Sequence, residues 1–262
     1  MMIGARWDDA AQNERFCEAA RRGLIDYAEV NFPVTDRETP AAFEIPILAH
    51  TSFNPLASAF GINEHVAAAV KQGADNANSP WVGEHLAWLG FEHQGALGYV
   101  FNPPFIEEFV EIAVANVRAL GEYYARPVAL ELAPVYAKSG TFESELHYLN
   151  AVATRADCAI ILDVAHWTIS NRNLARASDF GLDVLDLDRV IEIHVAGVRR
   201  GVSSPYWHDA HALPLSDDIL ALARDVGRKL PQLKAVTFEH AVSAPLEDFY
   251  GSLERLRERL AL

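Results

Sequence analysis

The chain has 262 residues, half of them apolar, which is long enough for one large hydrophobic core or for two small domains. Its 22 Lys and Arg residues face 36 Asp and Glu residues, and the formal net charge of −14 disfavours binding to nucleic acid or to an anionic membrane. The first residues carry no apolar signal segment, and no stretch approaches the ~18 consecutive apolar residues of a membrane span. We therefore expect a cytoplasmic protein that binds neither nucleic acid nor membrane.

Eight short apolar runs alternate along the chain with longer segments of helical period. The runs cover residues 3–7, 27–32, 45–51, 81–87, 127–132, 159–164, 190–195 and 235–238. The helical segments cover residues 9–23, 61–72, 104–124, 143–155, 216–230 and 246–260. Because the runs are continuously apolar rather than alternating, they predict parallel strands covered by helices on both faces. Eight strand–helix units in about 250 residues predict an α/β fold, a single (β/α)8 TIM barrel that forms one domain over residues 1–262.

Two of the eight units are weak. Residues 33–44 and 171–187 are too short for full helices, which leaves an open, doubly wound sheet as the alternative fold. No glycine-rich dinucleotide or phosphate loop follows any of the runs, and the barrel is therefore favoured.

The two cysteines are too few for a disulfide framework. Cys17 lies in an amphipathic helical pattern and Cys158 stands just before an apolar run. Both are expected to be buried free thiols.

Imidazole and carboxylate side chains gather at the carboxyl ends of the predicted strands, where the chemistry of a barrel takes place. The sixth run stops at Asp163, with His166 three residues later, although burying an unpaired carboxylate costs several kcal/mol. Any one such residue is more often a loop cap or a hydrogen-bonded side chain than a ligand. Six run ends and the loops after them, however, supply nine residues of the types that bind divalent transition metals: His50, His85, Glu131, Asp163, His166, His194, Asp209, His211 and Glu239.

Nine ligands are too many for one metal ion, which is completed by three or four. They predict a cluster of two or three ions in which carboxylates bridge. Without metal, the four converging carboxylates would repel one another and some would have to protonate. With about three divalent ions, the centre would carry a net positive charge and could hold an anionic group. The sequence therefore predicts that Asp163 and His166 are metal ligands.

The order of these residues resembles a known barrel superfamily. His, His, Glu, Asp-x-x-His, His, Asp-x-His, Glu along eight strands is similar to the endonuclease IV-like and xylose isomerase-like barrels. The resemblance implies three metal sites, with Glu131 shared between the first two: His50, His85 and Glu131; Glu131, Asp163, His194 and Glu239; and His166, Asp209 and His211.

Four local motifs resemble one branch of that superfamily. HTSFN is similar to a His-x-Ser-x-Asn signature, GEHLAW to Ser-Asp-His-Leu-x-Trp, and EIHVAG to Glu-Ile-His-Leu-Ala-Gly, while ELAP stands where Glu-Asn-Pro is found. This branch is the family of multinuclear non-haem iron-dependent oxidative enzymes, which includes the methanobactin biosynthesis and 3-thiaglutamate biosynthesis proteins. The resemblance spans most of the chain, from Ile3 to Glu239.

The resemblance implies an oxidase that uses two or three Fe ions and O2 to modify a residue, cysteine above all, of a ribosomally synthesised precursor peptide. It also implies a separate partner protein that binds the leader of that peptide. Four positions depart from the family's pattern: Glu84, Leu132–Ala133, His166 and Val198. The nine candidate ligands survive these departures, which bear instead on the third ion and on the substrate.

Three other functions fit parts of the pattern. A zinc phosphodiesterase of the endonuclease IV type could use the same nine ligands, but the strand-end loops are poor in Lys and Arg apart from Arg199 and Arg200. A sugar isomerase or epimerase of the same superfamily would need one or two metals and an acid–base pair, and would not require His166, Asp209 and His211. A non-enzymatic scaffold has no reason to bring nine ligands to one mouth.

Overall fold

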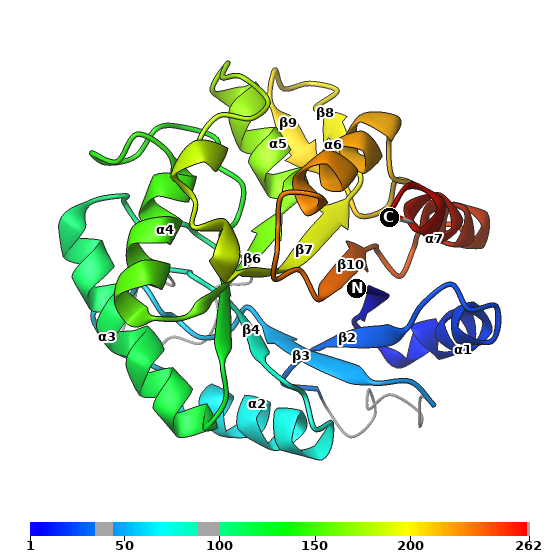
Figure 1. Ribbon diagram of the computed structural model, residues 1–262, viewed down its shortest axis with the longest axis horizontal. Helices are drawn as coiled ribbons and strands as arrows, with labels where there is room; N and C mark the ends of the chain where they lie inside the picture. The colour runs from blue at the N-terminus through cyan, green and yellow to red at the C-terminus, as the bar shows by residue number, and fades with distance from the viewer. Residues whose placement is uncertain (35–43, 89–99, 261–262) are drawn as a thin grey trace.

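The computed structural model describes residues 1–34, 44–88 and 100–260, and within them the chain forms a closed barrel of eight parallel strands (Figure 1). The order around the barrel is β1-β10-β7-β6-β5-β4-β3-β2. The strands are β1 Met2–Trp7, β2 Tyr27–Asn31, β3 Ile47–Thr51, β4 Val82–His85, β5 Val128–Glu131, β6 Ala159–Asp163, β7 Val190–Ala196 and β10 Ala235–Glu239.

The helices surround the barrel on its outside (Figure 1). They are α1 Asn13–Arg21, α2 Glu64–Asn76, α3 Glu107–Tyr124, α4 Glu145–Ala156, α5 Val164–Asn173, α6 Asp217–Gly227 and α7 Leu246–Leu260, with short 3-10 turns η1 Ala10–Gln12, η2 Leu182–Val184 and η3 Leu187–Arg189. Asn63 and Ser144 cap the first turns of α2 and α4 with side-chain oxygens, which satisfy backbone N–H groups that a helix leaves unpaired.

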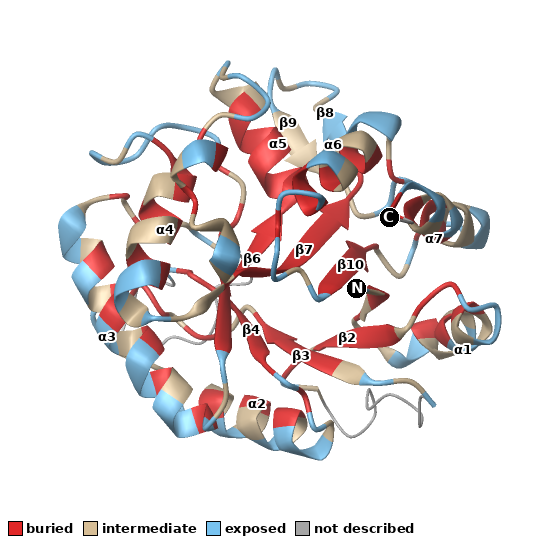
Figure 2. Cartoon of the chain, viewed as in Figure 1, coloured by how far each residue is buried: buried red, intermediate tan, exposed pale blue. Residues whose placement is uncertain are grey.

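Burial follows this architecture. The strands are buried along most of their length. Most helices bury only the face that packs on the barrel, whereas α5 is buried all round from Val164 to Asn171 (Figure 2). A second, smaller apolar cluster includes Tyr27, Trp81 and Ile161, which lie fully or almost fully buried on β2, just before β4 and on β6. Within the described residues, none of the helices combines the length and the apolar character of a membrane span.

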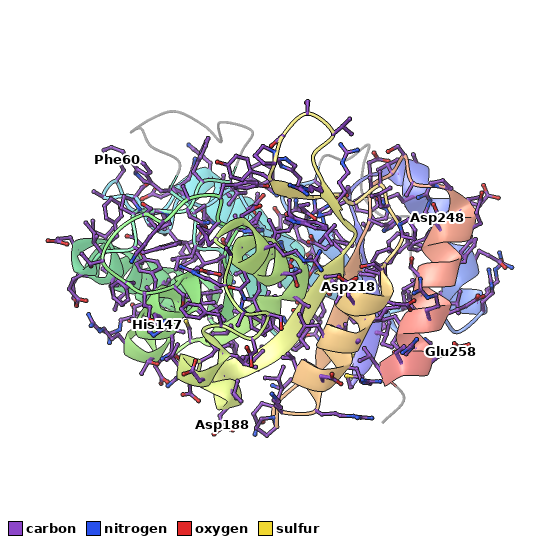
Figure 3. All side chains as sticks on the ribbon, turned by 90° about the horizontal axis from the view of Figure 1, so that it is seen from above. Phe60, His147, Asp188, Asp218, Asp248 and Glu258 are labelled. Atoms are coloured by element: carbon purple, nitrogen blue, oxygen red, sulfur yellow. The ribbon has the colours of Figure 1, made fainter. Side chains whose placement is uncertain are left out.

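A two-stranded antiparallel sheet stands after β7. It consists of β8 Val198–Arg200 and β9 Trp207–Asp209, and it contacts α5. In the side view this sheet and Phe60, which follows β3, lie at one end of the molecule, while Asp188, which precedes β7, lies at the opposite end (Figure 3). The sheet therefore belongs to the end where the barrel strands terminate.

The predicted (β/α)8 barrel is confirmed, since every predicted strand overlaps an observed one. Three details of the sequence reading are wrong. The first is that no helical segment was expected directly after the sixth run, yet α5 begins at Val164. Asp163 ends β6, and its side chain accepts a hydrogen bond from the backbone N–H of His166, as an N-cap does. Arg199 and Arg200 lie in a strand rather than in a loop.

The third detail concerns the cysteines, because Cys17 is exposed and Cys158 is only partly buried. Cys17 faces away from the apolar side of α1, where Phe16 and Ala19 are buried. Most of the segment 33–44, which the sequence analysis found too short for a full helix, lies outside the described residues. That residues 1–262 form one domain stays a prediction.

Candidate metal centre

The parallel register of the strands brings the candidate ligands together in pairs. His85 of β4 stands opposite Glu131 of β5, and Asp163 of β6 stands opposite His194 of β7. Because parallel strands of a barrel all end at the same mouth, residues far apart in sequence meet there. All four of these side chains are buried.

Glu131 lies at the middle of the group and is completely buried. Its Oε2 atom is 3.0 Å from Nε2 of His50, 3.2 Å from Nε2 of His85 and 3.4 Å from Nδ1 of His194. Its Oε1 atom is 3.2 Å from Nδ1 of His166. One carboxylate thus faces four imidazoles from four different elements.

A second part of the group surrounds Glu239. Its Oε1 atom is 3.4 Å from Nδ1 of His194, and its Oε2 atom is 3.2 Å from Nε2 of His211. His211 in turn lies 2.6 Å from Oδ2 of Asp209, which is 3.6 Å from Nε2 of His166. Asp209 and His211 are partly exposed, so this part of the group forms the rim of the mouth.

The structure therefore brings all nine candidate ligands into one connected group. Ligand atoms that lie within 4.8 Å of one another form five sets of three, drawn from eight of the nine residues together with Glu29: Glu29, His50 and His194; His50, His85 and Glu131; Glu131, Asp163 and His166; Asp163, His194 and Glu239; and His166, Asp209 and Glu239. His211, the ninth candidate, joins the group through its contacts with Asp209 and Glu239.

Unpaired donor atoms test whether these residues fit metal ions. A buried polar atom without a hydrogen bond costs about 1–3 kcal/mol and calls for an explanation. Among the described residues no hydrogen-bond partner is found for Nδ1 of His194, Oε1 of Glu131, Oδ2 of Asp163 or Oδ1 of Asp209. These are an imidazole nitrogen and carboxylate oxygens, the donors that divalent transition metals take. The residues present fit a metal cluster.

His166 shows how one imidazole is oriented. Its Nδ1 atom lies 3.0 Å from the carbonyl oxygen of Leu132, and its backbone N–H donates a hydrogen bond to Oδ1 of Asp163. An imidazole ring that is hydrogen-bonded through one nitrogen presents the other nitrogen, here Nε2, to a metal ion. Asp163 uses one oxygen to cap α5 and leaves the other unpaired, and so it both ends the strand and faces the group.

Burial and the neighbouring charges act together on the pKa values of the carboxylates and imidazoles in this group. Burial raises the pKa of Asp163 to about 7, and the neighbouring charges of Glu131 and Glu239 add to this effect. Burial alone would lower the pKa of His211, but its contacts with Asp209 and Glu239 raise it to about 10. Without metal, protons on the imidazoles balance the carboxylates, and a divalent cation would take their place.

The comparisons with known proteins decide the family. The sequence model of the RiPP precursor modification enzymes MbnB/TglH/ChrH matches residues 26–259. The chain belongs to this family. Its members are enzymes that modify a ribosomally made precursor peptide, so the predicted family is confirmed and the predicted function is confirmed at that level.

The chain is also similar to other proteins in sequence and in structure. A UPF0276 protein of Caulobacter vibrioides (strain NA1000 / CB15N) is 26% identical over 252 residues, which cover 92% of this chain and 89% of the relative. A UPF0276 protein of Neisseria meningitidis serogroup C is 29% identical over 212 residues, which cover 78% and 72%. D-psicose 3-epimerase of Clostridium cellulolyticum H10 matches the fold with a TM-score of 0.66 over 100% of both chains at 10% identity. The zinc-bound IOLI protein matches with a TM-score of 0.64 at 13% identity, over 100% of this chain and 98% of its own. Both likenesses show the (β/α)8 barrel fold alone.

Two charged residues of the candidate metal centre were not identified from the sequence. Glu29 of β2 is buried and faces His194. On β1, Nη1 of Arg6 lies 3.0 Å from Oε1 of Glu239. The positive charge of Arg6 helps to hold the pKa of Glu239 well below its usual range, against the effect of burial. The signal for Glu29 was present, because a carboxylate inside the apolar run YAEVN is as anomalous as Asp163.

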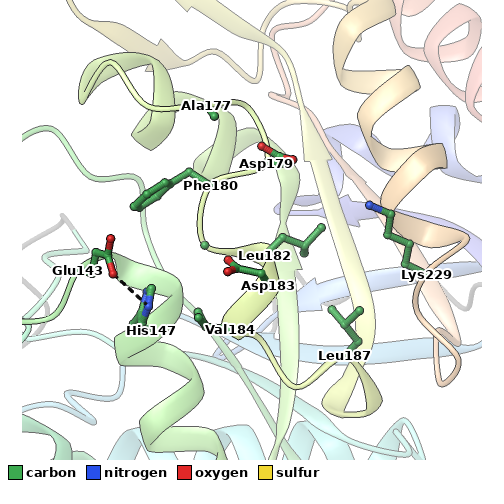
Figure 4. Close-up of a pocket in the computed structure, with 11 residues that line it drawn as sticks. Glu143, His147, Ala177, Asp179, Phe180, Leu182, Asp183, Val184, Leu187 and Lys229 are labelled. Carbon is green, nitrogen blue, oxygen red and sulfur yellow. Dashed lines mark ion pairs between the residues drawn. The ribbon is translucent and has the colours of Figure 1, made fainter.

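A cavity of about 550 Å³ lies apart from the candidate metal centre (Figure 4). It is lined by residues before and within α4, by the segment between α5 and η3, and by Lys229, and none of the nine candidate ligands faces it. Glu143 and His147 form an ion pair of 3.7 Å at its edge (Figure 4).

Proposed function

We propose that this protein is an iron- and dioxygen-dependent oxidase that modifies a residue, cysteine in the first place, of a ribosomally synthesised precursor peptide. The observation that carries the proposal is the group of buried, unpaired imidazole and carboxylate atoms around Glu131, in a member of a family of peptide-modifying enzymes. Imidazole and carboxylate ligands with open positions suit Fe(II).

The nine residues divide among two or three ions. His50 and His85 would hold the first ion and share Glu131 with the second. The remaining ligands are Asp163, His194 and Glu239 for the second ion, and His166, Asp209 and His211 for the third. Bound iron would supply a site for the substrate thiolate and the redox chemistry by which electrons and protons removed from the residue pass to dioxygen.

The chain's own residues prepare the site for this chemistry. The buried ligands Glu131 and His194 exclude water from the inner end, while the partly exposed Asp209 and His211 leave the outer end open to a peptide. Burial raises the pKa of the Tyr136 phenol, and the charge of Asp209 adds to this effect. Tyr136 is exposed, and its ring packs against Tyr206 and His208, which gives the rim an aromatic side.

The test needs a candidate peptide substrate, which is sought among the short reading frames beside the gene for this chain. The protein is loaded with Fe(II) without oxygen, and it is then mixed with a short cysteine-bearing peptide and a small companion protein from neighbouring reading frames. We expect oxygen uptake in step with a change in the mass of the peptide, and neither change with a peptide in which serine replaces the cysteine. The companion protein is the leader-binding partner of the proposal, so its omission should slow the reaction.

Other outcomes would assign the centre to other chemistry. Indifference to oxygen together with nicking of DNA that carries abasic sites would identify a zinc phosphodiesterase. Epimerisation of a free ketose without oxygen would identify a sugar isomerase or epimerase. Either result would overturn the proposed oxidase.

A further inference from the structure

His194 separates two groups of carboxylates with the two nitrogens of its ring. Nδ1 lies 3.4 Å from Oε2 of Glu131 and 3.4 Å from Oε1 of Glu239, both candidate ligands. Nε2 lies 3.0 Å from Oε2 of Glu29, in a hydrogen bond. His194 and Glu29 are almost completely buried, so water does not compete for this bond.

Glu29 lies deeper in the barrel than the mouth. It is on β2 two residues before Asn31, which stands opposite His50 in the strand register. A strand points every second side chain to the same side, and Glu29 therefore lies below the level of His50. An oxygen of Glu29 is within 4.8 Å of a ring nitrogen of His50, and the rings of His50 and His194 are 5.4 Å apart. One carboxylate thus faces two candidate ligands from below.

A second buried carboxylate, Glu192, lies beside this pair without taking the bond from Glu29. Its Oε1 accepts a hydrogen bond of 2.6 Å from Thr237 and its Oε2 one of 2.9 Å from the indole of Trp81. It is 3.6 Å from Nε2 of His194, beyond hydrogen-bond distance. Neutral donors satisfy Glu192, and the Nε2–H of His194 is left to Glu29.

We propose that Glu29 is a positioning residue of the metal centre. By accepting the Nε2–H of His194 it fixes the tautomer and the angle of the ring, presents Nδ1 to the metal and strengthens that nitrogen as a donor. A carboxylate behind a ligating histidine has this effect in metal sites generally. The inference rests on the proposed metal centre, and it does not depend on the reaction that the centre catalyses.

The alternative role for Glu29 is that of a ligand. Glu29, His50 and His194 themselves form one of the sets whose donor atoms lie close together. In that role Nε2 of His194 would face an ion, and Nδ1 could serve the ion beside Glu131 only if the ring bridged two ions. The number of ions bound at saturation separates the two roles.

The test compares Glu29→Gln with the wild-type chain. Glutamine keeps an oxygen acceptor of the same length and removes the charge. We expect the same number of ions at saturation and an affinity for Fe(II) that is about 10- to 100-fold lower, measured without oxygen against a competing chelator. The visible absorption bands of the Co(II)-loaded protein, which report ligand strength and geometry, should shift in the same variant.

Two further variants keep the result interpretable. Glu29→Leu removes the acceptor and should weaken binding more than Glu29→Gln. Glu145→Gln changes a buried carboxylate that pairs with Arg176 instead of a histidine, and it should leave affinity and spectrum unchanged. If circular dichroism of the metal-free chain shows that Glu29→Leu does not fold, Glu29→Gln alone tests the positioning role of Glu29.

Three results would overturn an assignment. Unchanged affinity and spectrum in Glu29→Gln would remove the positioning role. Loss of one ion at saturation would make Glu29 a ligand. A wild-type chain that binds neither Fe(II) nor Co(II) would overturn the proposed centre itself, whereas a chain that binds both metals without consuming oxygen would overturn only the proposed oxidase.

Discussion

Glu131 and Glu239 come from β5 and β10, which are separated by two strands of the barrel, yet an oxygen of each lies 3.4 Å from the same atom, Nδ1 of His194. Two carboxylates this close would repel one another if nothing positive lay between them. In the proposed centre Glu131, Glu239 and His194 would hold the same ion, and this shared contact is the reason.

The first prediction concerns the inner ligands. Wild-type protein loaded with Fe(II) should hold about two to three ions per chain, and His194→Ala or Asp163→Ala should remove most of them, because each residue belongs to the buried part of the group. Elemental analysis after desalting measures the content.

The matched control for these variants is His65→Ala. His65 lies exposed in the first turn of α2 and belongs to none of the sets of candidate ligands, so its loss should leave the metal content at the wild-type value. A single ion or none in the wild-type chain made with excess Fe(II) would speak against a cluster.

The second prediction separates the rim from the interior. His211 contacts Asp209 and Glu239 and is partly exposed, whereas Glu131 and its four imidazoles lie further inside. His211→Ala should therefore lose about one ion and keep the others, in contrast to His194→Ala. Equal losses in the two variants would show that the ions do not bind at separable sites.

The barrel could be predicted because its signals are local. Each strand is a short apolar run with a boundary that the sequence marks, and the carboxyl ends of eight parallel strands must meet at one mouth. The nine candidate ligands therefore needed no knowledge of distances. Glu29 was missed because it lies within a run rather than at its end, and only the register of β2 against β3 brings it beneath His50.

Three other features could not be predicted from the hydrophobic pattern of the sequence, because they depend on contacts in the folded structure. No turn residue marks the junction of β6 and α5, since Asp163 ends the strand and caps the helix at once. The β8–β9 sheet is too short for a periodicity to be visible. Which ring nitrogen of a histidine faces the metal is set by its other hydrogen bond, and for His166 that bond goes to a backbone carbonyl that no sequence motif encodes.

The third prediction uses a glycine that makes room for a ligand. A Cβ atom at Gly83 on β4 would lie 2.3 Å from Cδ2 of His50 and 2.8 Å from Cδ1 of Ile161. Gly83→Ala should push the ring of His50 away from Glu131 and reduce the metal content by about one ion, because a ligand displaced from its position by more than ~0.5 Å no longer fits.

The control for Gly83→Ala is Gly251→Ala in α7, where a new Cβ atom would meet nothing within 4 Å. That substitution should leave the metal content unchanged and stabilise the fold by about 0.5–1 kcal/mol, since alanine is the better helix former. Thermal unfolding and elemental analysis on both variants check the pair. Wild-type metal content in a folded Gly83→Ala chain would contradict the position assigned to His50.

The fourth prediction concerns the chain's own thiols, which would compete with a peptide cysteine in any thiol assay. Burial raises the pKa of Cys158 to about 12, from an ordinary value of 9.0, while Cys17 is exposed. The thiolate is the reactive form, so at a pH below both values Cys158 should react about 1,000-fold more slowly than an ordinary thiol.

Mass spectrometry after brief alkylation of the native chain at pH 8 should therefore show one modified cysteine, Cys17, and two after unfolding. The thiolate fraction grows as the pH approaches the pKa, and so labelling of Cys158 should rise only in strongly alkaline solution. Cys17→Ser should abolish the fast reaction and leave metal binding intact, because Cys17 lies on the outside of α1. Rapid labelling of the native Cys17→Ser chain at pH 8 would contradict the raised pKa of Cys158.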